Sequence, residues 1–162
     1  YDAWQYYPQL RELAALADAV PEASIVAGHC GGLLGTGKYA GPDNFANWRA
    51  QVLELAKRPN VVMKLGGLAH DRNGFAYRAR AQRPAPAELV ADWAPYVETC
   101  IETFGAARCM FESNFPVDAV AASYRDLWNV FKLITAACSP EERRALFAEN
   151  ARTVYRLQGD AE

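Results

Sequence analysis

Short apolar runs alternate with longer segments of helical periodicity along the whole chain, and this alternation limits the possible folds more than any single motif does. The short runs, which predict strands, are residues 1–6, 24–28, 61–65 and 109–112. Apolar residues recur at helical spacing over residues 10–20, 45–55, 89–104 and 124–134. Strands and helices that alternate in this way are typical of βα units and a parallel sheet.

Residues with known preferences for helix ends support these boundaries. Pro8 suits the first turn of the first helix, and Asp43 can cap the start of the second. Gly105 is placed to cap the end of the third helix. Ser139 and Pro140 then open a final helix, with serine as the cap and proline at its first position.

These elements amount to about four βα units plus a terminal helix, so the predicted fold class is α/β. Four parallel strands could form an open sheet, but a complete (β/α)8 barrel has about 250 residues, and 162 residues supply roughly half of one. We therefore expect a half-barrel. Its inner face and both edge strands would be exposed if no other segment covered them.

Composition argues against several classes of function. The chain is 51% hydrophobic and 12% aromatic, as expected for a globular domain with a core. Its 17 basic and 19 acidic residues are spread evenly, which predicts no nucleic-acid partner and no membrane partner. No run approaches the roughly 18 to 20 apolar residues of a membrane helix, and no secretory signal is recognisable. We expect a cytoplasmic protein that acts on a small molecule.

The cysteines and the first residue add two expectations. The cysteines are widely spaced and form no C-x-x-C pair, so we expect reduced thiols rather than a zinc knuckle or a disulfide framework. The chain begins with Tyr1 instead of methionine, inside an apolar run. We expect it to be part of a longer protein.

Polar side chains stand where the second and third predicted strands end, which is where α/β barrels place their catalytic groups. His29 precedes two glycines and could be a general acid/base, a metal ligand or a hydrogen-bonded structural histidine. Lys64 ends an otherwise apolar strand. It could bind an anionic group of the substrate or pair with a carboxylate such as Glu112.

Glu112 and Asn114 lie two residues apart where the fourth strand ends, so the alternation of side chains along a strand points them the same way. Glu112 could act as a base, or it could pair with Lys64 or His29. Asn114 could orient a carbonyl oxygen. These residues are the predicted catalytic set, together with His29.

A long loop over residues 69–86 is rich in arginine, glycine and proline. Its arginines could form a lid over an acidic substrate or could simply be solvated. They are Arg72, Arg78, Arg80 and Arg83. His70 of the same loop fits a solvated or lid residue better than a metal ligand.

Three segments carry a resemblance to a known family. Residues 28–32 read Gly-His-Cys-Gly-Gly, residues 60–67 read Asn-Val-Val-Met-Lys-Leu-Gly-Gly, and residues 108–118 read Arg-Cys-Met-Phe-Glu-Ser-Asn-Phe-Pro-Val-Asp. With them the chain resembles the amidohydrolase-related TIM-barrel hydrolases, the "amidohydrolase 2" group. The resemblance covers only the second half of such an enzyme, strands 5 to 8. It implies a partial barrel over residues 1–157 and a tail over residues 158–162.

The resemblance assigns roles to the strand ends, with two departures. His29 falls on the histidine of the family's H-x-G-G turn. In the family's F-G-S-D-W/F-P motif the aspartate binds metal or acts as the base, but here that position is Asn114, and Glu112 replaces the glycine. An amide is a poor ligand for a catalytic cation and cannot take a proton from water. A zinc or manganese site that includes His29 is therefore implied by the family but weakened by Asn114.

The second departure concerns the segment after the first strand. Relatives carry W-x-Y-H-P-Q there, whereas this chain has Tyr7 in place of the histidine. Tyr7 or Gln9 could instead hydrogen-bond the substrate. Asp118 could contribute to the site or cap the helix after Pro116.

The leading hypothesis from the resemblance is a hydrolase of a small carbonyl compound such as a lactone, with little reliance on metal. One alternative is a metal-dependent hydrolase or decarboxylase, completed by an H-x-H pair on an upstream strand. Another is a catalytically silent barrel that binds a small molecule. The 162 residues alone are expected to be inactive, because half of the site would be missing.

Overall fold

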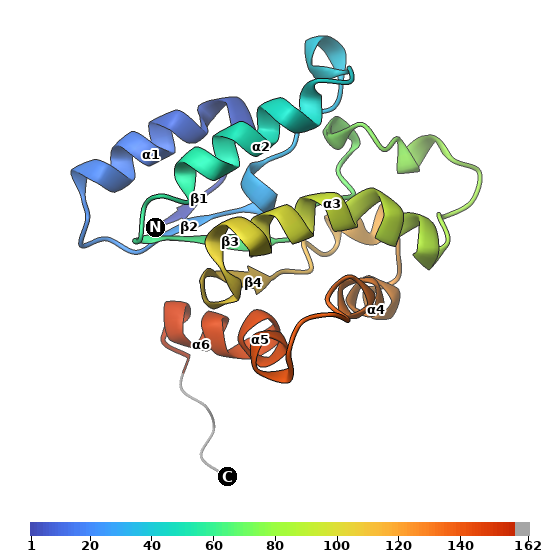
Figure 1. The fold of residues 1–162 in the computed structure, drawn as a ribbon. Coiled ribbons are helices and arrows are strands. Elements are labelled where there is room, and N and C mark those ends of the chain that lie inside the picture. The colour runs from blue at the N-terminus through green and yellow to red at the C-terminus, as the bar shows by residue number, and fades with distance from the viewer. Residues whose placement is uncertain (158–162) are drawn as a thin grey trace.

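The computed structural model describes residues 1–157 and contains one parallel sheet of four strands. The strands are β1 (Asp2–Ala3), β2 (Ile25–Ala27), β3 (Val61–Leu65) and β4 (Cys109–Phe111). They lie side by side in chain order, and every neighbouring pair is parallel. This is the order of strands in half of a (β/α)8 barrel, as predicted (Figure 1). The predicted tail over residues 158–162 lies outside the described residues.

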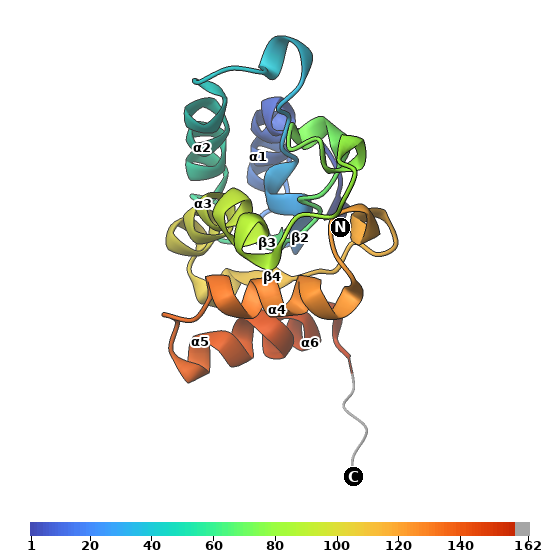
Figure 2. The ribbon, with the colours of Figure 1, turned by 90° about the vertical axis from the view of Figure 1, so that its right-hand side faces the viewer.

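The helices also follow the expected order. They are α1 (Leu10–Ala19), α2 (Asn44–Leu55), α3 (Pro86–Phe104), α4 (Tyr124–Ile134), α5 (Pro140–Arg144) and α6 (Asn150–Tyr155), with a π-helical turn over Ala145–Glu149 between the last two. From α1 to α4 each helix packs against the next along the outside of the sheet (Figures 1 and 2). None of the helices in residues 1–157 is long and apolar enough to cross a membrane.

The core lies between the sheet and these helices. Side chains that alternate along the strands, such as Ile25, Met63 and Leu65, are fully buried there against the helices. Trp48 of α2 and Trp93 of α3 are the largest side chains in this layer. Burial of an apolar side chain of this kind contributes about 1.5–3 kcal/mol, so the helix-facing layer is the main source of stability.

The opposite face of the sheet is the inner face of the half-barrel. The parallel register places Val26 beside Val62, and Lys64 beside Met110, on this face. Val26 and Met110 are each only 2% exposed, and the end of α6 lies beside Val26. There the Tyr155 hydroxyl donates a hydrogen bond of 2.6 Å to the Asp2 carboxylate. The expectation of an exposed inner face is therefore wrong at these two apolar positions.

Three predicted boundaries turn out as follows. Strand β1 is shorter than the predicted residues 1–6, because only Asp2 and Ala3 pair with β2 and a 3-10 turn follows over Tyr7–Gln9. Asp43 occupies the N-cap position of α2, but its side chain makes no capping hydrogen bond, so that part of the prediction is wrong. Ser139 does cap α5, and its hydroxyl accepts a hydrogen bond from the Glu142 amide.

The prediction that most of the cysteines are core thiols is confirmed. Cys30, Cys100 and Cys109 are buried free thiols, and Cys138 is a half-buried one. Burial raises the pKa of the Cys100 and Cys109 thiols, which keeps both protonated at neutral pH. These thiols are part of the core.

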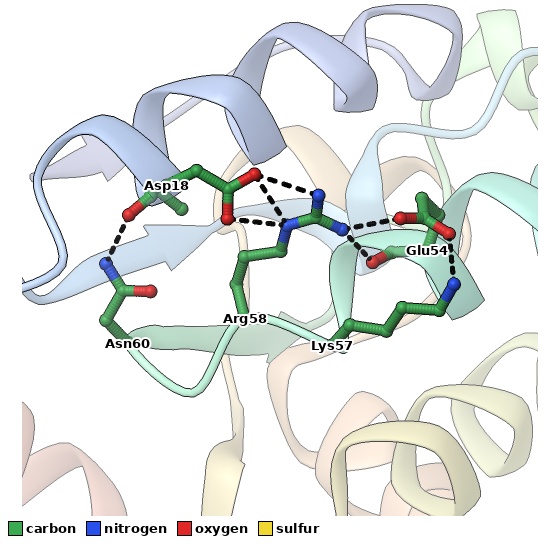
Figure 3. A network of polar contacts seen from close by, with 6 residues as sticks. Asp18, Glu54, Lys57, Arg58 and Asn60 are labelled. Carbon is green, nitrogen blue, oxygen red and sulfur yellow. Dashed lines mark hydrogen bonds and ion pairs between the residues drawn. The ribbon is translucent and has the colours of Figure 1, made fainter.

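A polar network joins α1 and α2 at the end of the sheet where the strands begin. Figure 3 shows the Arg58 guanidinium between the carboxylates of Asp18 and Glu54. Lys57 also pairs with Glu54. Because these carboxylates are largely exposed, each pair contributes only about 0–1 kcal/mol.

Two further side chains at this end bind backbone carbonyl groups. The Asn60 amide donates to the carbonyl oxygens of Ala17, Val20 and Ala23, which closes the turn between α1 and β2. The Arg108 guanidinium donates to carbonyl oxygens of residues 56, 58, 61 and 104. The end of the sheet opposite the predicted site is therefore tied together by satisfied polar groups.

Candidate active site

The centre of the candidate site is a contact between His29 and Glu112, which follow β2 and β4. Nδ1 of His29 lies 2.5 Å from Oε1 of Glu112, and the backbone amide of His29 donates to the same oxygen at 3.1 Å. Both side chains are largely buried. Two residues that are 83 positions apart in the sequence are thus joined at the carboxyl end of the sheet.

The local backbone after β2 is unusual and aims the imidazole. His29 and Cys30 have φ values of 55° and 51°, in the left-handed region that non-glycine residues rarely adopt. The buried Trp48 indole donates a hydrogen bond of 2.8 Å to the Cys30 carbonyl oxygen and so holds this turn. The turn places the histidine ring toward β4.

Lys64 of β3 stands beside Glu112 on the inner face. Its Nζ lies 3.4 Å from Oε2 of Glu112 and 3.1 Å from Oδ1 of Asp2. Burial alone would lower the pKa of Lys64, but Glu112 and Asp2 outweigh it and raise that pKa above its usual value. Two carboxylates therefore neutralise the ammonium group within the fold.

The same neighbours keep Glu112 ionised. Burial alone would raise its pKa, but the hydrogen bonds from His29 and the positive charge of Lys64 outweigh burial. The pKa of Glu112 therefore lies below its usual range, and the group is a carboxylate at neutral pH.

Two consecutive glycines after β3 make room for this pair. A Cβ atom on Gly66 would overlap the Glu112 backbone, and one on Gly67 would overlap the His29 imidazole. Gly67 also has a φ of 65°, which favours glycine. The two glycines lie within the segment that carries the resemblance, and their packing role is visible only in the structure.

Asn114 and Asp118 form a second polar pair near the first. Nδ2 of Asn114 donates to Oδ1 of Asp118 at 2.8 Å, and Asn114 itself has a left-handed φ of 49°. Asp118 is 1% exposed. Burial raises the pKa of its carboxyl group to about 6, even though the hydrogen bond from Asn114 acts in the opposite direction.

A cleft of about 240 Å³ opens in front of His29 at the carboxyl end of the strands. Its lining residues are Trp4, Gln5, Tyr6, His29, Gly32, Leu33, Gly67, His70, Asn73, Asn114 and Val117. Glu112 and Lys64 do not line the cleft and stand behind His29. The structure thus brings four of the predicted site residues together, with two of them at the cleft.

The predicted substrate-binding pair after β1 lies elsewhere. Tyr7 is buried in the core beside Tyr39, and burial raises the pKa of its phenol. Gln9 lines a neighbouring groove and accepts a hydrogen bond from the Tyr6 amide. Neither lines the cleft in front of His29, so their contact with substrate stays a prediction.

The arginines and the histidine of the loop over residues 69–86 lie in different places relative to the cleft. Arg78 pairs with Asp71, and Arg80 pairs with Glu88, both away from the cleft. The Arg72 guanidinium lies over the Tyr6 ring, in the neighbouring groove. His70 of this loop does line the cleft, consistent with a lid position.

Sequence reasoning missed several participants. Asp2 was not expected to partner Lys64, because this contact between β1 and β3 depends on how both strands align with β2 between them. Gln5 and Asn73 line the cleft but were not singled out. For Gln5 a signal existed, because it follows the first strand as His29 follows the second.

Comparison with known proteins decides the family. The model of the amidohydrolase family matches residues 3–157. The chain belongs to this family.

Two curated proteins of known sequence are similar to this amidohydrolase-family chain over most of its length. The chain is 39% identical over 157 residues to the uncharacterized protein y4mH of Sinorhizobium fredii. The aligned region covers 97% of this chain and 47% of that protein. The chain is 33% identical over 118 residues to an L-fucono-1,5-lactonase of Burkholderia multivorans, covering 72% of the chain and 38% of that enzyme. The chain thus spans about half, or less, of the length of these relatives.

A solved structure confirms the architecture. The crystal structure of a Burkholderia multivorans amidohydrolase with bound zinc superposes with a TM-score of 0.82 at 29% identity. The match covers 98% of this chain and 52% of that one. The amidohydrolase-family chain therefore has the fold of about half of an amidohydrolase TIM barrel, as the sequence predicted.

The residues of this chain do not by themselves fit a catalytic metal. Within residues 1–157, no group of three or more His, Cys, Asp or Glu side chains is arranged to hold one. A catalytic zinc usually has about three protein ligands, and Asn114 brings an amide where the family motif has a carboxylate. His29 has one ring nitrogen left to offer, because Nδ1 faces Glu112.

Proposed function

We propose that this chain provides the His29–Glu112 part of a hydrolase that opens the ring of a small lactone. The observation that carries the proposal is the contact between Nδ1 of His29 and Glu112 behind a cleft that His29 lines. The relative named L-fucono-1,5-lactonase supports a sugar lactone as the substrate class. Since the relatives are about twice as long, we propose that four further βα units complete the enzyme.

In this proposal His29 is the general base. The ionised Glu112 can only accept a hydrogen bond, so it selects the imidazole tautomer with the proton on Nδ1. The lone pair on Nε2 is then free, and Nε2 has no hydrogen-bond partner within residues 1–157. A histidine with this tautomer can take a proton from water, and the carboxylate behind it stabilises the resulting imidazolium.

Glu112 would therefore orient His29 and would not itself abstract the proton. Both of its oxygens are engaged, Oε1 by His29 and Oε2 by Lys64. Lys64 would hold this carboxylate in place. An anionic substrate group is a less favourable partner for Lys64, because two carboxylates already surround its ammonium group.

The reaction that follows from this arrangement is ordinary ester hydrolysis. Water attacks the lactone carbonyl carbon while its proton passes to Nε2 of His29. The ring C–O bond then breaks, and the leaving alkoxide takes the proton back from the imidazolium. The product is the open-chain hydroxy acid.

The test is lactone hydrolysis by the complete protein that contains this chain, followed by acid release with a pH indicator. We expect His29→Gln to lower kcat by about 10²–10⁴-fold, as is typical when a general base is lost. Glu112→Gln should cause a loss of comparable size, since an amide can donate to Nδ1 and no longer selects the tautomer with the proton there. Glu102→Gln, at an exposed position of α3, is the control. Wild-type rates in the His29 variant would disprove the assignment.

A metal-dependent hydrolase is the second candidate, and two observations favour it. One is the zinc bound in the similar structure. The other is that a carboxylate on Nδ1 is also the arrangement that orients metal-binding histidines. Elemental mass spectrometry of the complete protein, purified without chelator, separates the candidates. About one zinc or manganese per chain would favour this second reading, and a metal-free active enzyme would favour the first.

A further inference from the structure

Asp118 and Asn114 are joined by two hydrogen bonds, one between their side chains and one between their backbones. The Asn114 amide group donates to Oδ1 of Asp118 at 2.8 Å. The backbone amide of Asp118 donates in turn to the Asn114 carbonyl oxygen at 3.1 Å. These two bonds close a ring between the residue that lines the cleft and a carboxylate that is 1% exposed.

The position of Asp118 is costly for the fold. Its second oxygen, Oδ2, is buried without a well-formed hydrogen bond in the described part of the chain, although the Ala69 backbone amide also acts to lower the pKa of the carboxyl group. A buried polar atom without a well-formed hydrogen bond destabilises a protein. An apolar side chain of similar size would pack there at lower cost, so stability alone does not explain a carboxylate at this site.

The chemistry of the pair decides which end of the Asn114 amide faces the cleft. A carboxamide has a donor end and an acceptor end, whereas an ionised carboxylate only accepts. Asp118 is ionised at pH 7.5, because burial raises its pKa only to about 6. The NH2 group of Asn114 must then face Asp118, which leaves the carboxamide oxygen for the cleft.

We propose that Asp118 is a positioning residue that holds the carboxamide oxygen of Asn114 toward the cleft, so that Asn114 accepts a hydrogen bond from the attacking water or a substrate hydroxyl. Its catalytic part rests on the proposed lactone hydrolysis. Asn114 is thereby excluded as a donor to the developing oxyanion, which must find its donors elsewhere. The family's aspartate position keeps an acceptor oxygen in this chain but loses the ability to take up a proton.

The pair itself is tested by NMR on the full 162-residue chain at pH 7.5, without any assay of activity. The side-chain NH2 signals of Asn114 are identified by their loss in Asn114→Asp. In the wild type we expect their hydrogen exchange to be slowed by roughly tenfold or more, as for a bonded buried group. Asp118→Asn keeps an acceptor oxygen and should retain this protection, whereas Asp118→Leu should abolish it.

Glu102→Leu is the matched control, since it removes an exposed carboxylate and should leave the Asn114 signals unchanged. Unprotected exchange in the wild type would overturn the proposal. So would unchanged protection in Asp118→Leu.

The catalytic consequence is tested in the complete protein. Asp118→Leu should lower kcat as far as Asn114→Ala does, with little change in KM, and the double variant should be no slower than either. A merely structural Asp118 would change the melting temperature and leave kcat per folded molecule unchanged, which would overturn the catalytic part. If the wild type hydrolyses no lactone, the proposed function fails, while the exchange measurement still decides the Asp118–Asn114 pair.

Discussion

The buried carboxyl group of Asp118 should make the stability of this chain depend on pH in a direction opposite to that of most acidic residues. Burial raises the pKa of Asp118 from 3.8 to about 6 in the folded chain. At about 1.4 kcal/mol per pKa unit, this rise corresponds to about 3 kcal/mol. The folded state binds the proton more tightly than the unfolded state does. The contribution of Asp118 is therefore most favourable below pH 3.8 and is lost as the pH rises to about 6.

The comparison with Asp118→Asn isolates this effect, because asparagine has nearly the same shape and does not titrate. Urea unfolding of both chains is measured between pH 4 and pH 7. We expect the wild type to lose about 2 kcal/mol relative to the variant across this range, because part of the effect is already lost at pH 4. For an m value near 2 kcal/mol/M, this corresponds to a relative shift in midpoint of about 1 M. Parallel curves would refute the reasoning, since they would mean that Asp118 titrates normally in the fold.

Three further substitutions test other parts of the structure. Gly67→Ala should separate His29 from Glu112 and destabilise the chain by about 1–2 kcal/mol, because the new methyl group overlaps the imidazole and the residue has a left-handed φ. Loss of the NMR signal of the His29 Nδ1 proton would report the separation, and a retained signal would contradict the prediction. Arg108→Met removes four hydrogen bonds to backbone carbonyls and should cost about 2–4 kcal/mol in urea unfolding, whereas an unchanged midpoint would show that water replaces them. Ser139→Ala should cost about 1 kcal/mol and lower the melting temperature by about 2–4 °C; an equal melting temperature would mean that the cap does not stabilise the fold.

Most of the fold could be predicted from the sequence, because its strands and helices are specified locally. Strand β3 coincides with the predicted residues 61–65, since a run that is apolar except for Lys64 lies between Asn60 and two glycines. Gly105 ends α3 as predicted, with a positive φ of 78°. Ser139 caps α5 because its hydroxyl can reach an amide within one turn. Each of these features depends on residues only a few positions apart.

The site could be predicted only in part, because its contacts join residues far apart in the sequence. The strand ends correctly indicated His29 and Asn114 as cleft residues, since parallel strands end at the same edge. The partnership of Lys64 with Asp2 depends on strand register, which no local pattern reveals. The burial of Tyr7 in the core depends on packing against Tyr39. Tertiary structure decided both.

Polar groups are hydrogen-bonded at one end of the sheet, whereas two buried side-chain atoms lack good partners at the other. We infer that the first end serves stability and the second end serves the reaction. At the end where the strands begin, Arg108 and Asn60 satisfy backbone carbonyls. At the carboxyl end, Gln5 lines the cleft with a buried Nε2 that has no partner among residues 1–157, and Asp118 beside Asn114 has a buried Oδ2 without a well-formed hydrogen bond there. Unsatisfied groups destabilise a fold, and they are useful where a substrate can satisfy them. Asp118→Leu should therefore raise the free energy of unfolding at neutral pH while it lowers kcat, whereas Arg108→Met should lower the free energy of unfolding and leave kcat per folded molecule unchanged. If both variants changed stability and kcat in the same direction, this division between the two ends would be wrong.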